Sequence, residues 1–501
     1  MLSLPYFWDE AGYYVPAARD LLLAGSLIPH SVPSNAHPPL VMAWLALAWK
    51  IFGYSPLVAR TAMLFIAAFG LLAAFELARE VTNRQVAIAS TLCVALYPVY
   101  FAQSSLAHID LAAAGLTLWG ILFYVRGRFG LSALWLALAA LAKETAILAP
   151  LALLSWEFLN AREIFGIREI PGPAAIPHSR SGFKKTSLWL LLPVLPLALW
   201  FAYHYARTGY IFGNPDFFRY NVAATLQPQR IALAILRRAW QLVGHMNLYV
   251  LTLATALAML FPPQHDEGHE RPRIAVPNQL AFAAVIAVYW LALSVIGGAV
   301  LSRYLLPVIP LVIIICVSTI YRRIRGWQLI IALVCAAFIA GLFINPPYVF
   351  APEDNLAYRD YVVLHQQAAE FLAAHNPRAR VLTAWPASDE LRRPWLGYAQ
   401  QPINAVQIEN FSREEVEAAA QNATFDVALV FSTKYEPTHR LPAPEFWQRA
   451  QTRFFDYHRD LEAEEAAQIL GGEIVFWEKR GGQWVAVIKR EEIFLSRAGR
   501  M

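Results

Sequence analysis

Two adjacent carboxylates lie close to the amino terminus, in the stretch Phe7-Trp8-Asp9-Glu10-Ala11-Gly12-Tyr13-Tyr14. A short amphipathic run and then long hydrophobic segments follow, which places acid chemistry at a membrane surface. A carboxylate near an apolar boundary loses solvation, becomes more basic, and can take a proton from a hydroxyl or amine acceptor. The alternative for Asp9 is structural, because Asp favours the N-cap of a helix and one is predicted to begin near Ala11. Capping does not exclude catalysis.

The composition indicates a polytopic membrane protein. The chain has 501 residues, of which 57% are hydrophobic and only 15% charged, and its mean hydropathy is +0.41. That is more apolar surface than a soluble domain usually needs. The three cysteines, Cys93, Cys316 and Cys335, all fall inside hydrophobic runs, so they suggest packing rather than a disulfide framework or a metal cluster.

Ten segments are long and apolar enough to be candidate membrane spans, since a span needs roughly 20 mostly apolar residues and about 17 are tolerable. The pair around residues 130–160 is interrupted by Lys143-Glu144 and is either two short helices or one kinked passage. Residues 39–53 are short and contain Lys50, so we expect an interfacial helix there. The predicted spans lie near residues 57–78, 86–103, 109–126, 130–142, 144–160, 187–205, 241–262, 279–297, 304–320 and 327–345.

The charges predict the orientation of these spans. Residues 1–345 contain 24 Lys and Arg against 14 Asp and Glu, whereas residues 346–501 contain 17 against 22. The basic excess lies mostly in short loops, which indicates the positive-inside rule rather than nucleic-acid binding. The opposite, extracytoplasmic face then holds residues 1–56, the 104–110 turn, Lys143-Glu144, the 206–240 loop, Arg303 and the C-terminal region.

The chain is predicted to have two domains. Residues 1–345 form a transmembrane domain with a first external loop over residues 1–56, and residues 346–501 form a small soluble extracytoplasmic α/β domain. The second domain should contain helices near 358–375 and 412–420, strands at 380–385 and 426–431, and a hairpin of 473–478 with 483–489. Met1 to Phe7 contains neither a secretory signal nor a span, so we expect the original chain to begin earlier with one more span.

Acidic and basic side chains gather on the predicted external face. A charged group near the hydrocarbon is costly and is by default a functional candidate. Cations there can bind a phosphate and stabilise the charge that develops when the phosphate leaves. Together the two sets describe group transfer from a lipid phosphate. The acidic set is Asp9, Glu10, Asp110 and Glu144, and the basic set is His37, His108, Lys143, Arg207, Arg219, Arg237, Arg238 and Arg303.

Several short motifs, in order and on one side of the membrane, resemble those of GT-C superfamily membrane glycosyltransferases. The similarity is greatest to the protein O-mannosyltransferases and the lipid A aminoarabinose transferases. It covers the membrane region, residues 1–345. The motifs are Asp9-Glu10 before an amphipathic helix, His37-Pro38-Pro39-Leu40, Ala107-His108-Ile109-Asp110-Leu111, Leu141-Ala142-Lys143-Glu144-Thr145 and Ser302-Arg303-Tyr304-Leu305-Leu306-Pro307.

The resemblance implies a mainly α, GT-C-like bundle that carries out an inverting sugar transfer from a polyprenyl-phosphate donor to a lipid, glycan or protein acceptor on the extracytoplasmic face. It implies an integral protein of the bacterial inner membrane. Asp9 would be the catalytic base, with Glu10 beside it, and Asp110 would be the second catalytic carboxylate. His37 lies where the aminoarabinose transferases have Lys, so its phosphate contact would depend on pH. The implied donor-phosphate ligands are His37, Lys143 and Arg303, with possible support from His108, Glu144 and Tyr304.

Each candidate also has a structural interpretation. Lys143 and Glu144 could simply pair with each other at a helix junction, and Arg303 and Tyr304 could be interfacial anchors. His108 could be a satisfied interfacial histidine. A divalent metal could bind where the acidic residues converge. However, the sequence contains no DxD-type pair, and the transferases that it resembles mostly work without metal. We therefore expect no metal and no other cofactor.

Two other functions fit the same residues. In a transporter or flippase of lipid-linked sugars, the charges would line a passage, although such sites more often lie near the bilayer midplane on broken helices. In a non-catalytic envelope assembly protein, the α/β domain would bind a partner. Replacing Asp9 with Asn distinguishes these functions from glycosyl transfer, because only the transferase should lose activity while membrane insertion is retained.

Overall fold

The computed structural model describes residues 2–161, 180–266, 268–435, 437, 445–455 and 460–490. The chain divides into two compact units. The helical unit contains Tyr14–Ile344 and Glu353–Leu356, and the α/β unit contains Met1–Tyr13, Asn345–Pro352 and Ala357–Met501. Residues 1–13 thus group with the C-terminal residues, whereas we expected them in the first external loop of the membrane domain.

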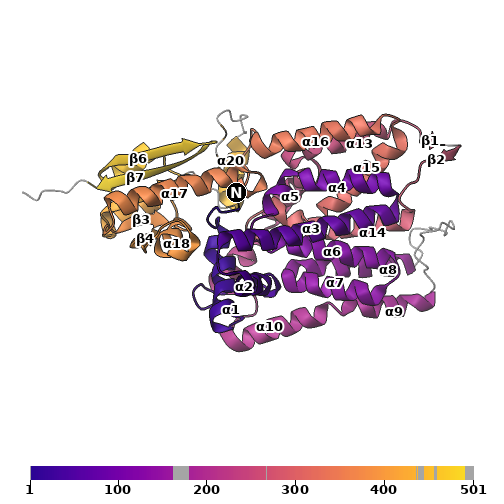
Figure 1. The fold of residues 1–501 in the computed structure, drawn as a ribbon, viewed down its shortest axis with the longest axis horizontal. Helices are drawn as coiled ribbons and strands as arrows, with labels where there is room; N and C mark the ends of the chain where they lie inside the picture. The colour runs from indigo at the N-terminus through magenta and orange to yellow at the C-terminus, as the bar shows by residue number, and fades with distance from the viewer. Residues whose placement is uncertain are drawn as a thin grey trace, which may run out of the picture. The chain divides into compact units, whose positions relative to one another are not determined.

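The helical unit is built from helices that run side by side over most of its length (Figure 1). A π-helical turn, η1 (Glu10–Tyr14), leads into the first of them. The α-helices are α1 (Val15–Ala24), α2 (Leu40–Phe52), α3 (Pro56–Val81), α4 (Arg84–Leu96), α5 (Pro98–Gln103), α6 (Asp110–Val125), α7 (Phe129–Ala142), α8 (Leu148–Ala161), α9 (Arg180–Leu191), α10 (Val194–Thr208), α11 (Pro215–Asn221), α12 (Pro228–Val243), α13 (Leu248–Ala258), α14 (Val276–Val295), α15 (Ile309–Arg323) and α16 (Trp327–Phe343), with a short hairpin of β1 (His265–Asp266) and β2 (His269–Glu270) between α13 and α14.

Every predicted span contains helix, and the ambiguous segment around residues 130–160 forms two helices, α7 and α8, joined by the turn η2 (Glu144–Ile147). Within the described ranges, three helical segments are long and apolar enough to cross a membrane, namely Pro56–Val81, Val276–Val295, and Thr186–Thr208, which contains the end of α9 and all of α10. Five shorter apolar helices accompany them, including Leu40–Phe52, where we expected an interfacial helix. The number of ten spans stays a prediction.

Two of the interruptions within predicted spans have a clear backbone cause. The span at 86–103 breaks into α4 and α5 because Pro98 disfavours helical geometry at Tyr97, whose ψ is 123°. The span predicted at 241–262 is wrong at its start. Met246 and Asn247 have positive φ angles of 49° and 65°, and a residue in the left-handed region cannot continue a right-handed helix.

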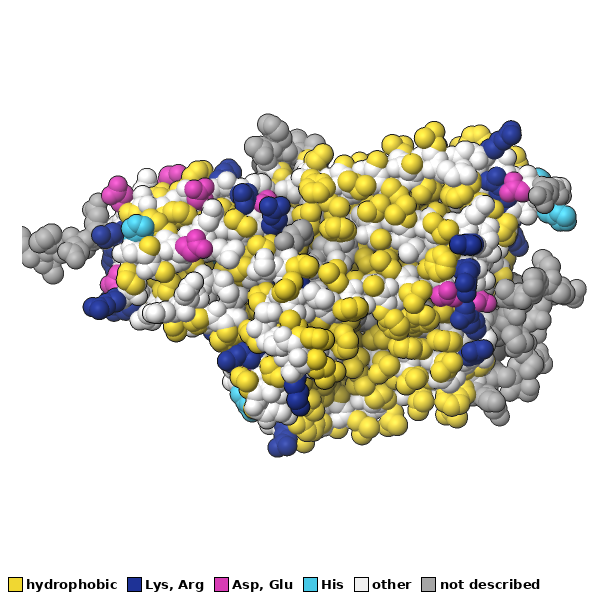
Figure 2. Space-filling view, in the orientation of Figure 1, with side chains coloured by type: hydrophobic (Ala, Val, Ile, Leu, Met, Phe, Trp, Pro, Cys, Tyr) yellow, Lys and Arg dark blue, Asp and Glu magenta, His cyan; other side chains and the backbone are white. Residues whose placement is uncertain are grey.

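Small residues let the helices approach closely. A Cβ placed on Gly115 of α6 would lie 2.9 Å from the Cα of Gly70 on α3, so the two backbones meet without intervening side chains, as in other small-residue helix interfaces of membrane proteins. Ser132 on α7 donates to the carbonyl of Gly120 on α6 at 2.8 Å. The face of this unit seen in Figure 2 is mainly hydrophobic, with charged side chains at its ends. A surface of this kind suits lipid.

The α/β unit contains a five-stranded mixed sheet of order β4-β3-β5-β7-β6. Strand β3 is parallel to β4 and β5, whereas β7 is antiparallel to β5 and β6. The predicted helices, strands and C-terminal hairpin are present. The elements are α17 (Ala357–His375), β3 (Val381–Ala384), α18 (Ala387–Arg392), β4 (Ala405–Ile408), α19 (Arg413–Asn422), β5 (Val427–Phe431), α20 (Glu445–Phe455), α21 (Ala463–Leu470), β6 (Gly472–Arg480) and β7 (Gln483–Arg490).

Candidate active site

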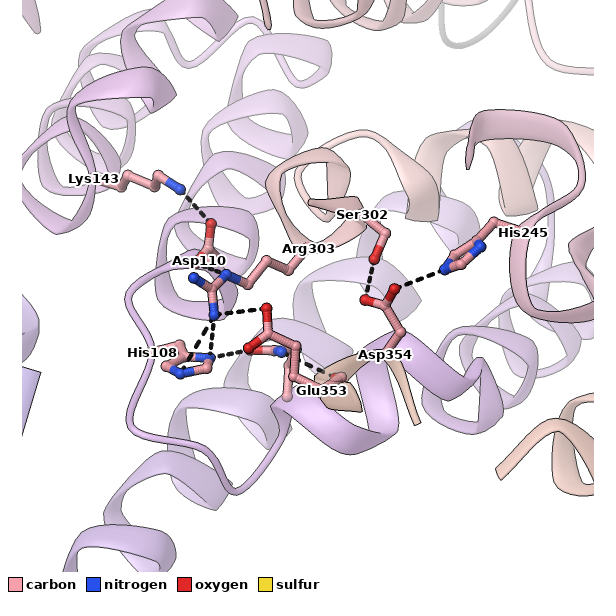
Figure 3. Close-up of polar contacts among 9 residues, drawn as sticks. His108, Asp110, Lys143, His245, Ser302, Arg303, Glu353 and Asp354 are labelled. Atoms are coloured by element: carbon pink, nitrogen blue, oxygen red, sulfur yellow. Dashed lines mark hydrogen bonds and ion pairs between the residues drawn. The ribbon is translucent and has the colours of Figure 1, made fainter. Parts of the chain in front are cut away.

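A buried charge cluster in the helical unit joins residues from three distant parts of the sequence (Figure 3). Asp110 is the first residue of α6, Lys143 directly follows α7, and Arg303 lies in the turn η5 (Ser302–Leu305). Lys143 Nζ donates to Asp110 Oδ1, and Arg303 Nε lies 3.4 Å from Asp110 Oδ2. The side chains of Asp110 and Arg303 are each only 1% exposed. Two cations therefore compensate the charge of one buried carboxylate, as a buried ion requires.

A second carboxylate contacts the same guanidinium. Glu353 Oε1 lies 2.9 Å from Arg303 NH1, and the Glu353 carbonyl accepts a hydrogen bond of 3.2 Å from Gln103 Nε2. Glu353 belongs to the short segment Glu353–Leu356, which groups with the helical unit although its neighbours in sequence do not. Arg303 therefore lies between two carboxylates.

The next residue, Asp354, is also buried and paired. Its Oδ2 lies 2.9 Å from His245 Nε2, and its Oδ1 accepts a hydrogen bond from Ser302 Oγ. Because Ser302 and Arg303 are consecutive, the adjacent acids Glu353 and Asp354 contact two consecutive residues of η5 (Figure 3). This double contact fixes the turn that carries Arg303.

His108 lies in the loop before α6, against Arg303. Burial lowers the pKa of the His108 imidazole well below its usual value, and nearby cations, above all Arg303, lower it further. The ring is therefore neutral at pH 7. Arg303 Nη1 lies 2.9 Å from His108 Nδ1, and the side-chain oxygen of Gln103 lies 2.8 Å from the same nitrogen. His108 thus lies in contact with both Arg303 and Gln103, and the supporting role predicted for it stays a prediction.

Glu144 pairs with His37 rather than with Lys143. Glu144 Oε2 lies 3.0 Å from His37 Nδ1, so the interpretation in which Lys143 and Glu144 merely pair with each other is wrong. Burial alone would raise the pKa of Glu144, but His37 and Lys143 lower it to about 2. The His37 ring also contacts the rings of Tyr14 and Phe217, at centroid distances of 5.8 and 5.5 Å.

The Tyr304 ring covers the Lys143 ammonium. Lys143 Nζ lies 3.8 Å from the ring centre, and Arg303 Cζ lies 5.7 Å from it. Cation–π contacts at these distances favour positive charge at the ring face. Because Arg303 is buried, it is not an interfacial anchor. The helical unit therefore brings together Asp110, Lys143, Arg303, His108 and Tyr304, and separately His37 with Glu144.

Asp9 and Glu10 belong to the α/β unit, so the meeting predicted between Asp9 and the Asp110 cluster stays a prediction. Asp9 is partly exposed and directly precedes η1. Glu10 is fully buried. Its Oε2 accepts a hydrogen bond of 2.7 Å from the Phe7 amide, and its own amide donates to the Phe7 carbonyl at 2.8 Å. Through these contacts Glu10 stabilises the backbone between Phe7 and Glu10, which is a structural role.

Four residues of the site were not among those predicted from the sequence, namely Glu353, Asp354, His245 and Ser302. Glu353 and Asp354 stand where the composition changes from apolar to polar, so they were assigned to the soluble domain. Ser302 adjoins Arg303 and is the one member that its place in a motif could have indicated. His245 follows a glycine inside an otherwise apolar run. A histidine at such a position is only a weak indication of a functional site.

Within the described ranges, no group of three or more His, Cys, Asp or Glu side chains could hold a metal ion. The expectation that the reaction needs neither metal nor other cofactor stays a prediction.

Comparisons with known proteins address the fold. Residues 36–168 match the family of dolichyl-phosphate-mannose-protein mannosyltransferases. The structure is similar to that of ArnT from Cupriavidus metallidurans bound to undecaprenyl phosphate, with a TM-score of 0.55 and 14% identity over 97% of this chain and 95% of that chain. The apo state of the same protein gives a TM-score of 0.53 and 14% identity over 97% and 94%. No curated protein sequence matches this chain.

The chain has the GT-C fold. The expected resemblance to GT-C superfamily membrane glycosyltransferases is thereby confirmed. The expected architecture, a mainly helical region followed by a small α/β domain, is confirmed as well. With so few identical residues, the similarity to ArnT concerns the fold alone. The candidate residues His37, His108, Asp110, Lys143 and Glu144 fall within the segment that matches the mannosyltransferase family.

Proposed function

We propose that this protein is a GT-C glycosyltransferase that transfers a sugar from a polyprenyl-phosphate-linked donor to a lipid, glycan or protein acceptor, with inversion, on the extracytoplasmic face of the membrane. The mannosyltransferase family is named for a lipid-phosphate sugar donor, and ArnT binds undecaprenyl phosphate. Both support a polyprenyl-phosphate donor here. They leave the sugar and the acceptor open.

The reaction breaks one bond and forms one bond at the anomeric carbon. A base removes the proton from the acceptor hydroxyl or amine, and the acceptor atom attacks that carbon. The bond between the carbon and the phosphate oxygen breaks, and its electrons leave with the phosphate. The donor phosphodiester carries one negative charge and the released phosphate monoester carries two, so cations near the phosphate stabilise the transition state more than the bound donor.

Asp9 is the proposed base, because it is a partly exposed carboxylate in the first of the motifs that resemble GT-C transferases. Asp110 is the proposed second catalytic carboxylate, and its contacts with Lys143 and Arg303 fix its orientation. Lys143, Arg303 and His37 are the proposed donor-phosphate ligands. Because carboxylates already contact these three side chains, they are held in place before the donor arrives, which reduces the cost of reorganisation.

One observation supports this proposal above the others. A buried cluster of two cations and two carboxylates, namely Lys143, Arg303, Asp110 and Glu353, lies within a GT-C fold. Burying four charges costs free energy that hydrophobic packing would not. A cluster of this kind is therefore a functional candidate in a membrane protein.

A direct assay tests the proposal. The purified protein, reconstituted in lipid, is incubated with a panel of tritiated undecaprenyl-phosphate hexoses and pentoses together with a membrane extract as the source of acceptors. We expect one donor to label a lipid, glycan or protein, and Asp9→Asn to reduce labelling by about 1,000-fold or more, since a general base and the positioning of its acceptor each contribute on the order of 100-fold.

The matched control is Asp216→Asn, which makes the same chemical change at an exposed carboxylate in α11 and should leave labelling unchanged. Absence of labelling with every donor would contradict the transferase function. Full labelling by Asp9→Asn would remove Asp9 from the mechanism. Uptake of a lipid-linked sugar into vesicles without any transfer would favour the transporter.

A further inference from the structure

The segment that carries Asp9 is built into the α/β unit, although almost all of that unit comes from the other end of the sequence. The Tyr6 amide donates to the Leu396 carbonyl at 3.4 Å, and Tyr398 Oη donates to the Tyr6 carbonyl at 3.0 Å. Tyr6 and Phe7 are fully buried. Hydrogen bonds to both the amide and the carbonyl of Tyr6 therefore fix the chain just before Asp9.

Aromatic rings fix the next two residues. The Phe7 ring meets Tyr361 edge-on at a centroid distance of 5.2 Å, and the Trp8 ring meets Tyr361 and Trp385 edge-on, each at 5.5 Å. Edge-to-face pairs of this kind add about 0.5–1.5 kcal/mol each beyond the burial of their area. Trp8, the immediate neighbour of Asp9, is thus held between a residue of α17 and the residue two positions before α18.

The backbone of Trp8 is in an unusual conformation. Its φ is +42°, a region that bulky residues rarely adopt and that persists only where the surroundings enforce it. The π-helical turn η1 begins two residues later, and such turns are frequent at functional sites. In this conformation Trp8 packs against Tyr361 and Trp385, and Asp9 is the next residue of the chain.

Gly12 allows this turn to lie against the Trp385 side chain. A Cβ on Gly12 would lie 2.3 Å from Trp385 Cζ2, which is closer than any real contact, so only glycine permits the approach. The Gly12 amide donates to the Trp8 carbonyl at 2.8 Å. The Glu10 carboxylate accepts from the Phe7 amide. Asp9 therefore lies between residues that are fixed on both sides.

The surface that holds the segment is itself rigid. The Tyr361 ring stacks on the His365 ring at 3.8 Å, and His365 Nδ1 lies 2.6 Å from Glu390 Oε2. Both side chains of this pair are 2% exposed. The pair links α17, which carries Tyr361, to α18, which begins two residues after Trp385.

We infer that the α/β unit is a positioning domain for the proposed base: Trp385, Tyr361 and Tyr398 set the conformation of residues 6–12 and with it the orientation of the Asp9 carboxylate. This inference rests on the proposed function and gives the C-terminal domain a task in catalysis. None of these three residues contacts substrate in this scheme. They act through Asp9.

Trp385→Ala and Gly12→Ala in the full-length protein test the inference, with the donor from the panel that supports transfer. We expect either change to reduce kcat by about 10- to 100-fold, the effect of roughly 1 Å of misplacement, with the KM for the donor unchanged. Trp385→Phe should restore most of the rate. The matched control is Trp477→Ala, because Trp477 is 49% exposed on β6 of the same unit, and kcat should stay within about twofold.

Two further measurements separate positioning from loss of structure. Hydrogen exchange at the Tyr6 and Gly12 amides should accelerate in Trp385→Ala while the amides of β5 and β7 keep their protection. The double variant Asp9→Asn, Trp385→Ala should be no slower than Asp9→Asn alone, because a residue that acts only through Asp9 has no effect once Asp9 is lost.

Three results would overturn the inference while leaving the proposed function intact. These are normal kcat in both Trp385→Ala and Gly12→Ala, rate losses that multiply in the double variant, and unchanged exchange at Tyr6 and Gly12. An active Asp9→Asn protein would instead refute the proposed base, and with it the reason for positioning.

Discussion

Arg303 joins two buried carboxylates and one buried histidine of the helical unit, because it contacts Asp110, Glu353 and His108. Removing one partner of a buried ion pair usually destabilises a protein by roughly 3–5 kcal/mol, since the remaining charge has no compensation. The sequence indicated Arg303, Asp110 and Lys143, because each follows or precedes a hydrophobic run in a motif. It could not indicate Glu353, whose partner Arg303 lies on the far side of two predicted spans.

Arg303→Met should therefore destabilise the helical unit by about 3–5 kcal/mol, because Asp110 and Glu353 would both lose a positive neighbour. Arg303→Lys should cost less, since the charge remains but the second contact is lost. Thermal unfolding in detergent measures the difference. Arg325→Met, at an exposed position, is the control and should unfold as the wild type does. Equal melting temperatures for Arg303→Met and the wild type would contradict the assignment.

The pair His37–Glu144 makes stability depend on pH in the acid range. The folded pKa of Glu144, about 2, lies below its value of about 4.3 in the unfolded chain. The pair therefore stabilises the fold fully above pH of about 4.3, and this contribution decreases as the pH falls towards 2. Glu144→Gln should be less stable than the wild type at pH 6, and the difference should shrink by pH 3.

Unfolding of both proteins by denaturant at several pH values, in the same detergent, measures that difference. Asp216→Gln, which alters an exposed carboxylate, should show no such convergence with the wild type. The contrary result would be a difference in unfolding free energy between Glu144→Gln and the wild type that stays constant from pH 6 to pH 3. That result would mean that the Glu144 carboxylate is not stabilised by its neighbours.

At the scale of the elements, hydropathy located the helices but not their interruptions. The long apolar runs predicted α3, α6 and α14 closely, because a span of about 20 apolar residues has few alternatives. The break at His245–Asn247 depends on two positive φ angles at non-glycine residues, for which the sequence carries no clear signal. In the α/β unit, β4 and α18 were missed because they are too short for a periodic pattern.

The contact between α3 and α6 should tolerate no added side chain. Gly115→Ala puts a methyl group 2.9 Å from a backbone carbon of Gly70, so the helices must separate. We expect a loss of about 1–3 kcal/mol from overpacking, which exceeds the roughly 0.5–1 kcal/mol that alanine normally adds to a helix over glycine. Thermal unfolding in detergent provides the measurement.

The control for that experiment is Gly326→Ala, since nothing lies within 4 Å of an added Cβ there. Gly326→Ala should unfold at the wild-type temperature or slightly above it. A Gly115→Ala protein as stable as the wild type would mean that the two helices lie farther apart than the structure has them.

At the scale of the whole molecule, the predicted orientation places the α/β unit outside the cell and the loop after α15 inside it. The three native cysteines are buried, so they should react slowly with maleimides. New cysteines at the exposed positions Glu478 and Arg325 can therefore report on the two sides. Glu478→Cys should react with a membrane-impermeant maleimide in intact cells, and Arg325→Cys only after permeabilisation. The reverse pattern would refute the orientation.

The chain passes between its two units at residues 13–14, 344–345, 352–353 and 356–357, and this has a practical consequence for protein engineering. A stop codon after Ile344 would not excise a self-contained appendage. It would remove Glu353 and Asp354 from Arg303 and Ser302, and it would leave Phe7 and Trp8 without their aromatic neighbours. Chimeras with proteins of the same fold should therefore exchange Met1–Tyr13, Asn345–Pro352 and Ala357–Met501 together, and should keep the native Glu353–Leu356 with the helical unit.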